Sequence, residues 1–535
     1  MRSVKVGPVF PTWLKTQKYL RYLCLSDAGI SGNIPAWFGY LSPSSSYFLD
    51  LSNNNLEGRL STSLKNYTFH SIDLSSNKFE GPLPELDPSS LHVIHLSNNS
   101  FSGSIPSYFA NATYIHFVSL SNNHISGSIP SFICNLTILE LFDVSNNDMS
   151  GALPNCWNSA SALQIIHLSD NNFTGKIPDA LVSLTNLRSL HLRNNGFFGD
   201  LPLSLKMANK LVTLDLGENK LSGSIPTWIG ENLSSLIVLR LRSNYFEGII
   251  PEQLSKLSSL QILDFAQNNL SGCIPHSFGD FKAMAVTNHN ETLSVVLDFG
   301  FFLSFVGGID NSNFAFWESF FIRAKGLQIE YSKLLSLVTS IDLSNNKLSC
   351  DLPKELTKLQ GLHFLNLSSN LLNGRIPENI GDMKQLESLD LSENNLFGTI
   401  PSSISTLNFL AYLNVSHNNL SGKIPSGTQL QSFDQSAYNW NHGLCGSPLQ
   451  NCANEMNPPA VYEEDRKGDW AEMLWLYIGL AMGFIIGLWM IFGTFIIKQT
   501  IRIAYFQSID KVYDWIYVKV VVHSRRLKLT FSRRN

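Results

Sequence analysis

The chain of 535 residues lacks the motifs by which common enzyme classes are recognised. Its thirteen histidines form no H-E-x-x-H or other metal-ligand spacing. No Gly-rich phosphate loop or H-R-D motif follows its last apolar segment, and the part that remains there, 498–535, is far too short for a kinase. The sequence therefore predicts a non-enzymatic protein without a cofactor or metal, and nothing in it points to a nucleic-acid ligand.

Long apolar runs are also scarce. The run Leu293–Val306 contains Asp298 and is too short to span a bilayer. Met473–Ile497, in contrast, carries no charge and is long enough to span a bilayer as a helix. The following segment is basic, with nine Lys or Arg against Asp510 and Asp514. By the positive-inside rule we expect one membrane helix, a cytoplasmic tail and an extracellular N-terminal part.

The remaining sequence is dominated by one repeated phrase, as in LDLGENKLSGSIP at Leu214–Pro226. Fifteen copies are present, and most recur at one constant interval. The Asn that closes each L-x-L-x-x-N falls at Asn54, Asn77, Asn99, Asn123, Asn147, Asn171, Asn195, Asn219, Asn244 and Asn268, and then at Asn346, Asn370, Asn394 and Asn418. A degenerate first copy spans Leu23–Pro35. This interval and pattern indicate a leucine-rich-repeat solenoid.

Each repeat predicts a short strand followed by a return. The leucines of Leu190-His191-Leu192 point inward and the residue between them points outward, so stacked strands form a parallel sheet on a concave face. The closing Asn is expected to bond to neighbouring loop backbone. In the G-x-I-P segment, Gly permits an unusual backbone angle, Pro resists helix and Ile adds a second inward anchor. The fold class is therefore an α/β repeat solenoid.

The motif LxxLxLSxNxLxGxIP resembles the plant-type leucine-rich repeat, and the chain resembles plant leucine-rich-repeat receptor-like proteins, of the kinase-lacking, immune-receptor type. The resemblance implies a superhelix with an island insertion and a single transmembrane helix. That family begins with a signal peptide and a cysteine-bearing cap, whereas this sequence begins MRSVKVGPVFPTWL without an apolar region. We therefore expect an N-terminally truncated chain.

An interruption in the period locates the island. The interval from Asn268 to Asn346 is more than three times the usual one, so most of the segment between them does not belong to the repeat, and it is rich in phenylalanine. The end of this segment, Lys325 to Tyr331, is similar to the family's Lys-five residues-Tyr motif, which lies beside the surface that meets a co-receptor kinase. The predicted organisation is repeats at 1–280, an island at 281–336, four repeats at 337–430, a cap at 431–455, an acidic juxtamembrane segment at 456–472, a transmembrane helix at 473–497 and a tail at 498–535.

Cysteines, glycines and glycosylation sequons add smaller predictions. Cys445 and Cys452 resemble the pair that caps the last repeat in the family, and Cys134 and Cys156 lie on adjacent repeats where a second disulfide would fit. Cys24, Cys273 and Cys350 have no obvious partners, and Cys350 replaces the consensus Gly of its repeat. Gly479, Gly483 and Gly487 share one helix face, suited to close helix association. The glycosylation candidates are Asn66, Asn98, Asn111, Asn135, Asn172, Asn232, Asn269 and Asn290.

The outward strand positions indicate where a ligand binds. The position after the second leucine is Ser in most repeats, but it becomes Arg193, Gly217, Arg242 and Ala266 just before the island. The predicted ligand-binding residues are Arg188, His191, Arg193, Asp215, Arg240, Arg242 and Asp264, and an acidic ligand group is favoured near the arginines. The alternative is that Arg240 forms ion pairs with Asp215 and Asp264 within the solenoid.

The resulting functional hypothesis is a single-pass type I receptor in the plasma membrane. It would bind an extracellular peptide or protein, associate with an adaptor receptor kinase through the membrane helix, and recruit a ligand-induced co-receptor kinase through the island and last four repeats. A pathogen-derived ligand is favoured by the resemblance. The alternatives are a developmental peptide co-receptor, and a non-signalling wall-associated inhibitor or decoy of microbial enzymes.

Overall fold

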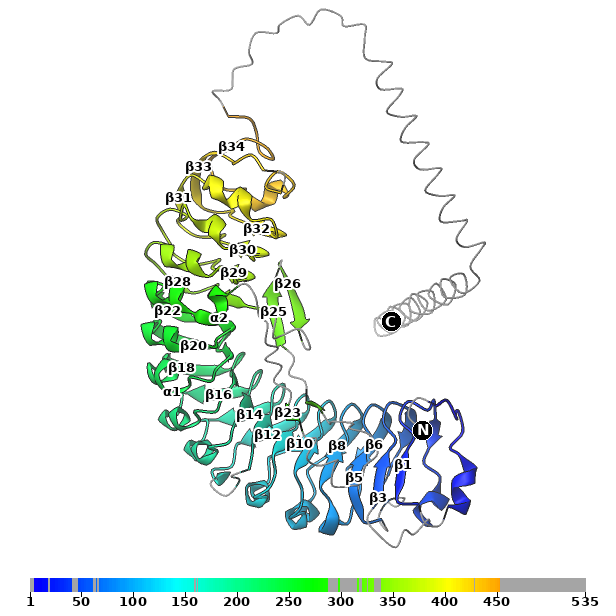
Figure 1. The fold of residues 1–535 in the computed structure, drawn as a ribbon. Coiled ribbons are helices and arrows are strands. Elements are labelled where there is room, and N and C mark those ends of the chain that lie inside the picture. The colour runs from blue at the N-terminus through cyan, green and yellow to red at the C-terminus, as the bar shows by residue number, and fades with distance from the viewer. Residues whose placement is uncertain are drawn as a thin grey trace, which may run out of the picture. The chain divides into compact units, whose positions relative to one another are not determined.

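One parallel sheet runs the length of the repeat stack, and a second parallel sheet accompanies it as far as Leu348 (Figure 1). The computed structural model describes residues 4–452 except 18–19, 41–46, 61–63, 65–66, 158–159, 161, 287–296, 299–314, 317–319, 325, 332–337 and 428. Within this part, no helix is long and apolar enough to cross a membrane. The predicted juxtamembrane segment, membrane helix with Gly479, Gly483 and Gly487, and tail lie outside the described residues, as do Asn66, Asn290 and Lys325.

The first sheet has one short strand per repeat and, in the described chain, fifteen strands in sequence order. They are β1 (Tyr22–Cys24), β3 (Tyr47–Asp50), β5 (Phe69–Asp73), β7 (Val93–His95), β9 (Phe117–Ser119), β11 (Leu141–Asp143), β13 (Ile165–His167), β15 (Ser189–His191), β17 (Thr213–Asp215), β19 (Val238–Arg240), β21 (Ile262–Asp264), β27 (Ser340–Asp342), β29 (Phe364–Asn366), β30 (Ser388–Asp390) and β32 (Tyr412–Asn414). All neighbours are parallel, for example Leu190 opposite Leu214. The predicted parallel concave sheet is confirmed.

The closing Asn of each repeat forms a ladder of side-chain hydrogen bonds. Asn147 Nδ2 donates to the carbonyls of Leu120 (3.0 Å) and Val144 (3.1 Å), and its Oδ1 accepts from Ile125 N at 2.8 Å. The same pattern recurs from Asn54 to Asn418. The residue before each ladder Asn has positive φ, such as Asn146 at 52°. The Asn side chain therefore satisfies buried backbone groups that this turn leaves unpaired, as the sequence predicts.

The second sheet is formed by the segment that follows the ladder Asn in each repeat. Its strands, in the described residues, are β2 (Ser31–Asn33), β4 (Asn55–Gly58), β6 (Lys78–Pro82), β8 (Ser100–Gly103), β10 (His124–Gly127), β12 (Asp148–Ala152), β14 (Asn172–Gly175), β16 (Gly196–Gly199), β18 (Lys220–Ser224), β20 (Tyr245–Ile249), β22 (Asn269–Gly272) and β28 (Lys347–Leu348). The consensus Gly of these strands has positive φ, as predicted; Gly223 is at 83°.

The returns are mostly single 3-10 turns, and most of them follow the proline of the G-x-I-P segment. These turns are η1 (Thr12–Thr16), η2 (Ala36–Tyr40), η3 (Pro88–Ser90), η4 (Ser107–Asn111), η5 (Ser131–Asn135), η7 (Asp179–Ser183), η8 (Leu203–Met207), η9 (Glu252–Lys256), η10 (His276–Asp280), η13 (Lys354–Lys358), η14 (Ile380–Asp382), η15 (Ser402–Thr406) and η16 (Gln435–Ala437). The α-helices among the described residues are α1 (Trp228–Asn232) and α2 (Lys282–Ala285). A continuous apolar core runs between sheets and returns, from Phe10 to Leu444.

The stack continues directly across the interruption in the repeat period. β21 pairs with β27, with Leu263 opposite Ile341, and Leu270 N donates to Asn346 Oδ1 at 3.0 Å. Between them, two antiparallel pairs are described: β23 (Leu297–Asp298) with β24 (Ala315–Phe316), and β25 (Phe320–Ala324) with β26 (Leu327–Tyr331). The turn of the second pair lies close to Tyr412 on the concave face, because a Cβ on Gly326 would approach the Tyr412 ring to 3.1 Å.

A disulfide that the sequence analysis did not find joins the two sides of this insertion. Cys273 is bonded to Cys350, so the view that these cysteines lack partners is wrong. Cys350 also adopts φ of 72°, close to the angle of the Gly that it replaces, so the turn keeps its shape. The second sheet nevertheless ends at β28, and a separate sheet of β31 (Phe397–Gly398), β33 (Asn419–Lys423) and β34 (Gly443–Cys445) follows.

Of the other five cysteines, four form disulfides and Cys24 remains a thiol. The structure contains the disulfides Cys134–Cys156 and Cys445–Cys452, which are the two pairs that the sequence analysis names. The second of these closes the end of the stack, where β34 pairs with β33. Cys24 is buried, and its thiol donates to Asp50 Oδ2 at 3.1 Å.

Candidate ligand-binding surface

The serine column of the concave sheet has a structural role. In a standard repeat, both the amide and the hydroxyl of the Ser donate to the carboxylate two residues earlier. Ser145 donates to Asp143 Oδ1 from N (3.0 Å) and from Oγ (2.7 Å). The same arrangement joins Ser52 to Asp50 and Ser392 to Asp390. A strand acid and the following Ser therefore form one hydrogen-bonded unit, and a repeat without the Ser must satisfy its acid in another way.

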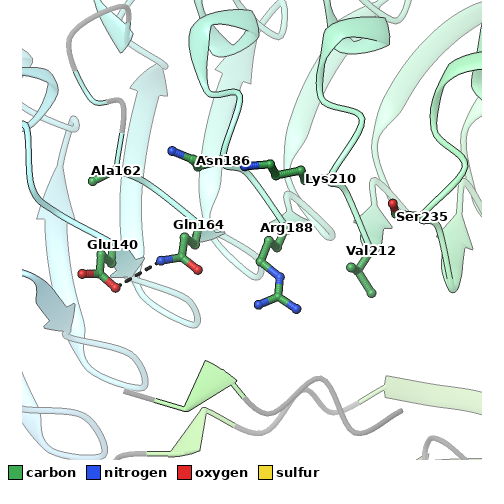
Figure 2. A pocket seen from close by; sticks show the side chains of 8 residues that line it. All are labelled: Glu140, Ala162, Gln164, Asn186, Arg188, Lys210, Val212 and Ser235. Carbon is green, nitrogen blue, oxygen red and sulfur yellow. Dashed lines mark hydrogen bonds between the residues drawn. The ribbon is translucent and has the colours of Figure 1, made fainter. Parts of the chain in front are cut away.

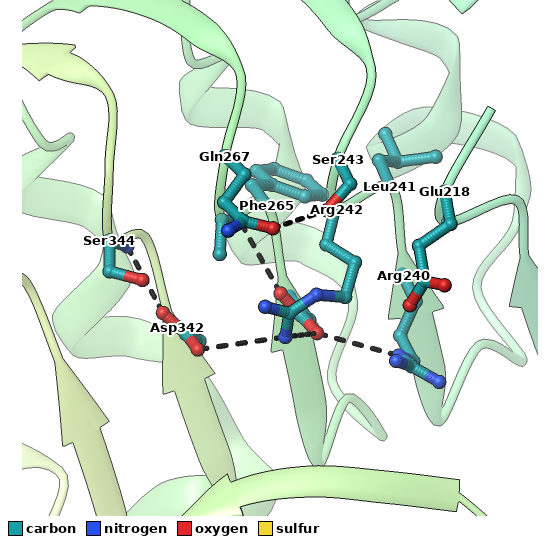
Figure 3. A network of polar contacts seen from close by, with 12 residues as sticks. Glu218, Arg240, Leu241, Arg242, Ser243, Phe265, Gln267, Asp342 and Ser344 are labelled. Carbon is teal, nitrogen blue, oxygen red and sulfur yellow. Dashed lines mark hydrogen bonds and ion pairs between the residues drawn. The ribbon is translucent and has the colours of Figure 1, made fainter. Parts of the chain in front are cut away.

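Where the Ser is replaced, an arginine donates to the strand acid in place of the Ser hydroxyl (Figure 3). Asp215 and Asp264 keep the backbone hydrogen bond, from Gly217 N and Ala266 N, but have no following hydroxyl. Arg240, on the strand between them, donates to both acids instead: its Nη1 lies 2.9 Å from Asp215 Oδ2 and its Nε lies 3.4 Å from Asp264 Oδ2. Its side chain is only 2% exposed. The structure thus favours the alternative for Arg240, which forms ion pairs inside the solenoid.

Arg242 continues the same cluster toward the end of the stack. Its Nη1 lies 2.9 Å from Asp264 Oδ2 and 3.9 Å from Asp342 Oδ2, and its side chain is 12% exposed. Burial alone would lower the pKa of Arg242, but Asp264 and Asp342 raise it. Arg242 therefore stays charged and is committed to two carboxylates of the protein.

The Arg240 cluster consists of Arg240, Arg242, Asp215, Asp264 and Asp342, so it has three carboxylates but two guanidinium groups. Arg240 and Arg242 face Asp215, Asp264 and Asp342, and Asp342 is the least well partnered of the three. Its Oδ1 accepts from Ser344 N at 3.0 Å, whereas its buried Oδ2 accepts no hydrogen bond from any described residue. Burial first, and then repulsion from Asp264, raise the pKa of Asp342 to about 6. The excess negative charge is therefore concentrated on Asp342.

Two further predicted residues also have partners within the protein. Arg193 pairs with Glu218 at 2.9 Å, and its side chain is 17% exposed. Burial opposes its charge, but Glu218 chiefly raises the pKa of Arg193. His191 is buried, lies 2.7 Å from Ser189 Oγ and packs on His167 at a ring-centroid distance of 4.6 Å.

Arg188 differs from the other six predicted residues. It precedes β15 and, with Lys210, lines a groove of about 600 Å³ along the edge where the concave strands begin (Figure 2). The lining residues are Glu140, Ala162, Gln164, Asn186, Arg188, Lys210, Val212 and Ser235. Figure 2 shows the guanidinium directed away from the strand, whereas Glu140 and Gln164 point toward each other. The geometry brings Arg188 together with Lys210, and separates it from the Arg240 cluster.

Sequence reasoning missed Glu218, Asp342, Asn186 and Lys210. Asp342 could have been found by continuing the strand-acid column across the insertion, because it lies opposite Asp264. Tyr331 is the last residue of β26. The six described glycosylation candidates, Asn98, Asn111, Asn135, Asn172, Asn232 and Asn269, are exposed and none lines the groove. Across the described residues, no group of three or more His, Cys, Asp or Glu could hold a metal.

Comparisons with known proteins agree with this architecture. The Leucine Rich Repeat family model matches half of the chain, at residues 47–67, 90–112, 114–136, 162–184, 186–207, 210–232, 235–257, 259–281, 337–359, 361–383, 385–407 and 409–429. Receptor-like protein EIX2 of Solanum lycopersicum is 41% identical over 98% of this chain and 49% of its own length, so the chain spans about half of that relative.

Solved structures with the same fold include two plant receptors. The Arabidopsis receptor kinase HAESA, in complex with the peptide hormone IDA and the co-receptor SERK1, is 29% identical with a TM-score of 0.65, over 84% of this chain and 65% of that one. The plant peptide hormone receptor RGFR1, in complex with RGF2, is 28% identical with a TM-score of 0.62, over 83% and 69%. The chain therefore belongs to the leucine-rich repeat family, and its pattern of similarity is that of a plant leucine-rich-repeat receptor-like protein.

Proposed function

We propose that this chain is part of a cell-surface receptor that binds an extracellular peptide or protein, pathogen-derived by the family resemblance, and signals through partner receptor kinases. The observation that carries the proposal is the similarity to a receptor-like protein along 98% of the chain. Solved receptors of the same fold that bind peptide hormones support a peptide ligand. The basic tail after residues 473–497 supports a plasma-membrane location with the repeats outside.

Partner kinases are proposed at two places. An adaptor receptor kinase would associate with the membrane helix through the face that carries Gly479, Gly483 and Gly487. A co-receptor kinase would bind near the island and last four repeats, where the family motif places Lys325 and Tyr331. The complex of HAESA with its co-receptor supports a co-receptor as a partner for a protein of this fold.

Co-purification from plant cells tests the adaptor. The tagged full chain is compared with a variant in which Gly479, Gly483 and Gly487 are replaced by Leu, and recovered proteins are identified by mass spectrometry. Ala481→Leu is the matched control, because it adds similar bulk between two of the glycines but on a different helix face. A receptor kinase recovered with the native chain and control, but not with the triple variant, supports the proposal. If neither the native chain nor the control recovers a kinase, the signalling role is wrong.

Charge reversal of Arg193 and Arg242 is not a clean test of ligand binding. An acidic residue at position 242 would face Asp264 and Asp342, and one at position 193 would face Glu218. Either change would add buried like-charge repulsion and destabilise the sheet, whatever the ligand does. A ligand test must use a residue whose charge the fold does not itself require.

A further inference from the structure

Among the four predicted ligand-binding arginines, Arg188 is the one whose charge no carboxylate of the described residues balances. Arg193, Arg240 and Arg242 each form an ion pair of 2.9 Å with a carboxylate of the chain. Among the described residues, the Arg188 guanidinium makes no hydrogen bond or ion pair. Its neighbours at the same position of the adjacent repeats, Gln164 and Val212, are uncharged.

Glu140, the one carboxylate among the described residues that line the groove, already has two partners. Glu140 Oε1 lies 2.9 Å from His116 Nδ1, and Glu140 Oε2 accepts from Gln164 Nε2 at 3.1 Å. Within the part of the chain that the structure describes, the Lys210 ammonium has a neutral hydrogen-bond partner, since its Nζ donates to Asn186 Oδ1 at 2.8 Å. The groove therefore presents two positive charges, and its negative charge is held at one end by a histidine and an amide.

The backbone holds Arg188 firmly in this position. Arg188 N donates to Gln164 O at 2.8 Å, and its carbonyl accepts from Val212 N (2.7 Å) and Thr213 N (3.1 Å). The side chain is half-buried, so part of its hydration is already lost in the unliganded protein. A partly desolvated guanidinium that projects from a fixed backbone position is well suited to bind a carboxylate through two parallel hydrogen bonds.

We propose that this groove is the anchor site for a carboxylate of an extracellular peptide, with Arg188 as its bidentate partner and Lys210 as the second positive charge. This inference rests on the proposed function and specifies the ligand chemistry of that surface. A peptide is favoured over an acidic polysaccharide, because two cations are flanked by the side-chain amides of Gln164 and Asn186 and the apolar surface of Ala162 and Val212. A chain of uronates would require a longer row of cations.

Peptide mixtures test the anchor without knowledge of the ligand. The probes are synthetic twelve-residue peptides with random uncharged flanks and either Asp or Asn at a fixed central position, each made with a free or an amidated C-terminus. They are passed over the immobilised full chain, and retained peptides are quantified by mass spectrometry. The variants are Arg188→Gln and Arg188→Lys. Arg59→Gln is the control, because Arg59 is an exposed arginine that follows β4 in the second sheet.

The native chain and the control should retain carboxylate-bearing peptides about tenfold more than the Asn peptides with amidated ends. Arg188→Gln should abolish this preference, and Arg188→Lys should retain part of it, because the charge remains but the bidentate geometry is lost. The Asp and free C-terminus sets show which carboxylate is recognised. Equal retention of all sets by the native chain, or a preference that persists in Arg188→Gln, would overturn the anchor but leave peptide binding intact. Retention of no set would overturn both.

Discussion

Replacement of Asp342 by Asn should make the concave sheet more stable at neutral pH, although it removes an ion-pair partner. The Arg240 cluster has two guanidinium groups and three carboxylates, and Asp342 carries the excess charge. Asn at this position keeps the Oδ1 acceptor for Ser344 N. The change therefore removes a buried charge without leaving that backbone donor unsatisfied.

The magnitude follows from the pKa of Asp342, which burial raises from its ordinary value of 3.8 to about 6. The folded chain binds this proton more tightly than the unfolded chain does. Stability from this group is therefore complete below pH 3.8 and is lost as the pH rises to about 6. A difference of about 2 in pKa is worth about 3 kcal/mol. We expect Asp342→Asn to recover up to that amount at pH 7 and almost nothing at pH 4.

Hydrogen exchange measures the effect where it occurs. The amide of Phe265 donates to Asp342 O at 2.8 Å and that of Leu343 donates to Asn366 O at 2.9 Å, so both report on the opening of β27. At pH 7 they should exchange up to about a hundredfold more slowly in the variant than in the native chain. Comparison at equal pH removes the intrinsic pH dependence of exchange.

Asp390→Asn is the matched control. Asp390 occupies the same strand position in β30, where Ser392 donates to it from N and Oγ, and no described arginine contacts it. The control should not slow exchange at pH 7. Faster or unchanged exchange in Asp342→Asn at pH 7, or a difference from the native chain that is the same at pH 4 and pH 7, would refute the excess-charge argument.

Three further comparisons probe separate parts of the scaffold. Arg240→Met should cost about 3–5 kcal/mol in chemical denaturation, because it leaves Asp215 buried without an ion-pair partner and Asp264 with Arg242 alone. Arg193→Met, in a more exposed pair, should cost about 1 kcal/mol or less, and equal costs would contradict the assigned burial. Asn147→Ala should cost about 3 kcal/mol, because it leaves the buried Ile125 amide without its acceptor and removes one of the ladder hydrogen bonds to each of the Leu120 and Val144 carbonyls; normal exchange of the Ile125 amide would be the contrary result. Replacing Cys273 and Cys350 together by Ser should destabilise the pairing of β22 with β28, which the disulfide follows directly, by about 3–4 kcal/mol in urea unfolding; unfolding unchanged from the native chain would show that the disulfide is dispensable.

The repeat scaffold could be predicted almost completely because each of its elements depends on local rules. The leucine pair sets the inward face of each strand, the ladder Asn satisfies the turn, and Gly223 and its equivalents supply the positive φ. Even the pairing of β21 with β27 follows from counting the period across the insertion. The Cys273–Cys350 disulfide was not predictable in the same way, because it replaces a consensus Gly and connects residues 77 positions apart.

The binding surface was harder to predict, for a physical reason. A break in a repeated column has two causes that look alike in sequence: selection for a ligand, or the loss of one internal partner and its replacement by another. Asp215 and Asp264 have no adjacent Ser hydroxyl, and Arg240 and Arg242 donate to them instead, so these departures from the repeat need no ligand to explain them. Only the charge balance in three dimensions separates the two causes. An outward arginine is a ligand candidate when the adjacent repeats hold no carboxylate within reach, and by that criterion Arg188, at the edge of the sheet, is the better anchor than the arginines at its centre.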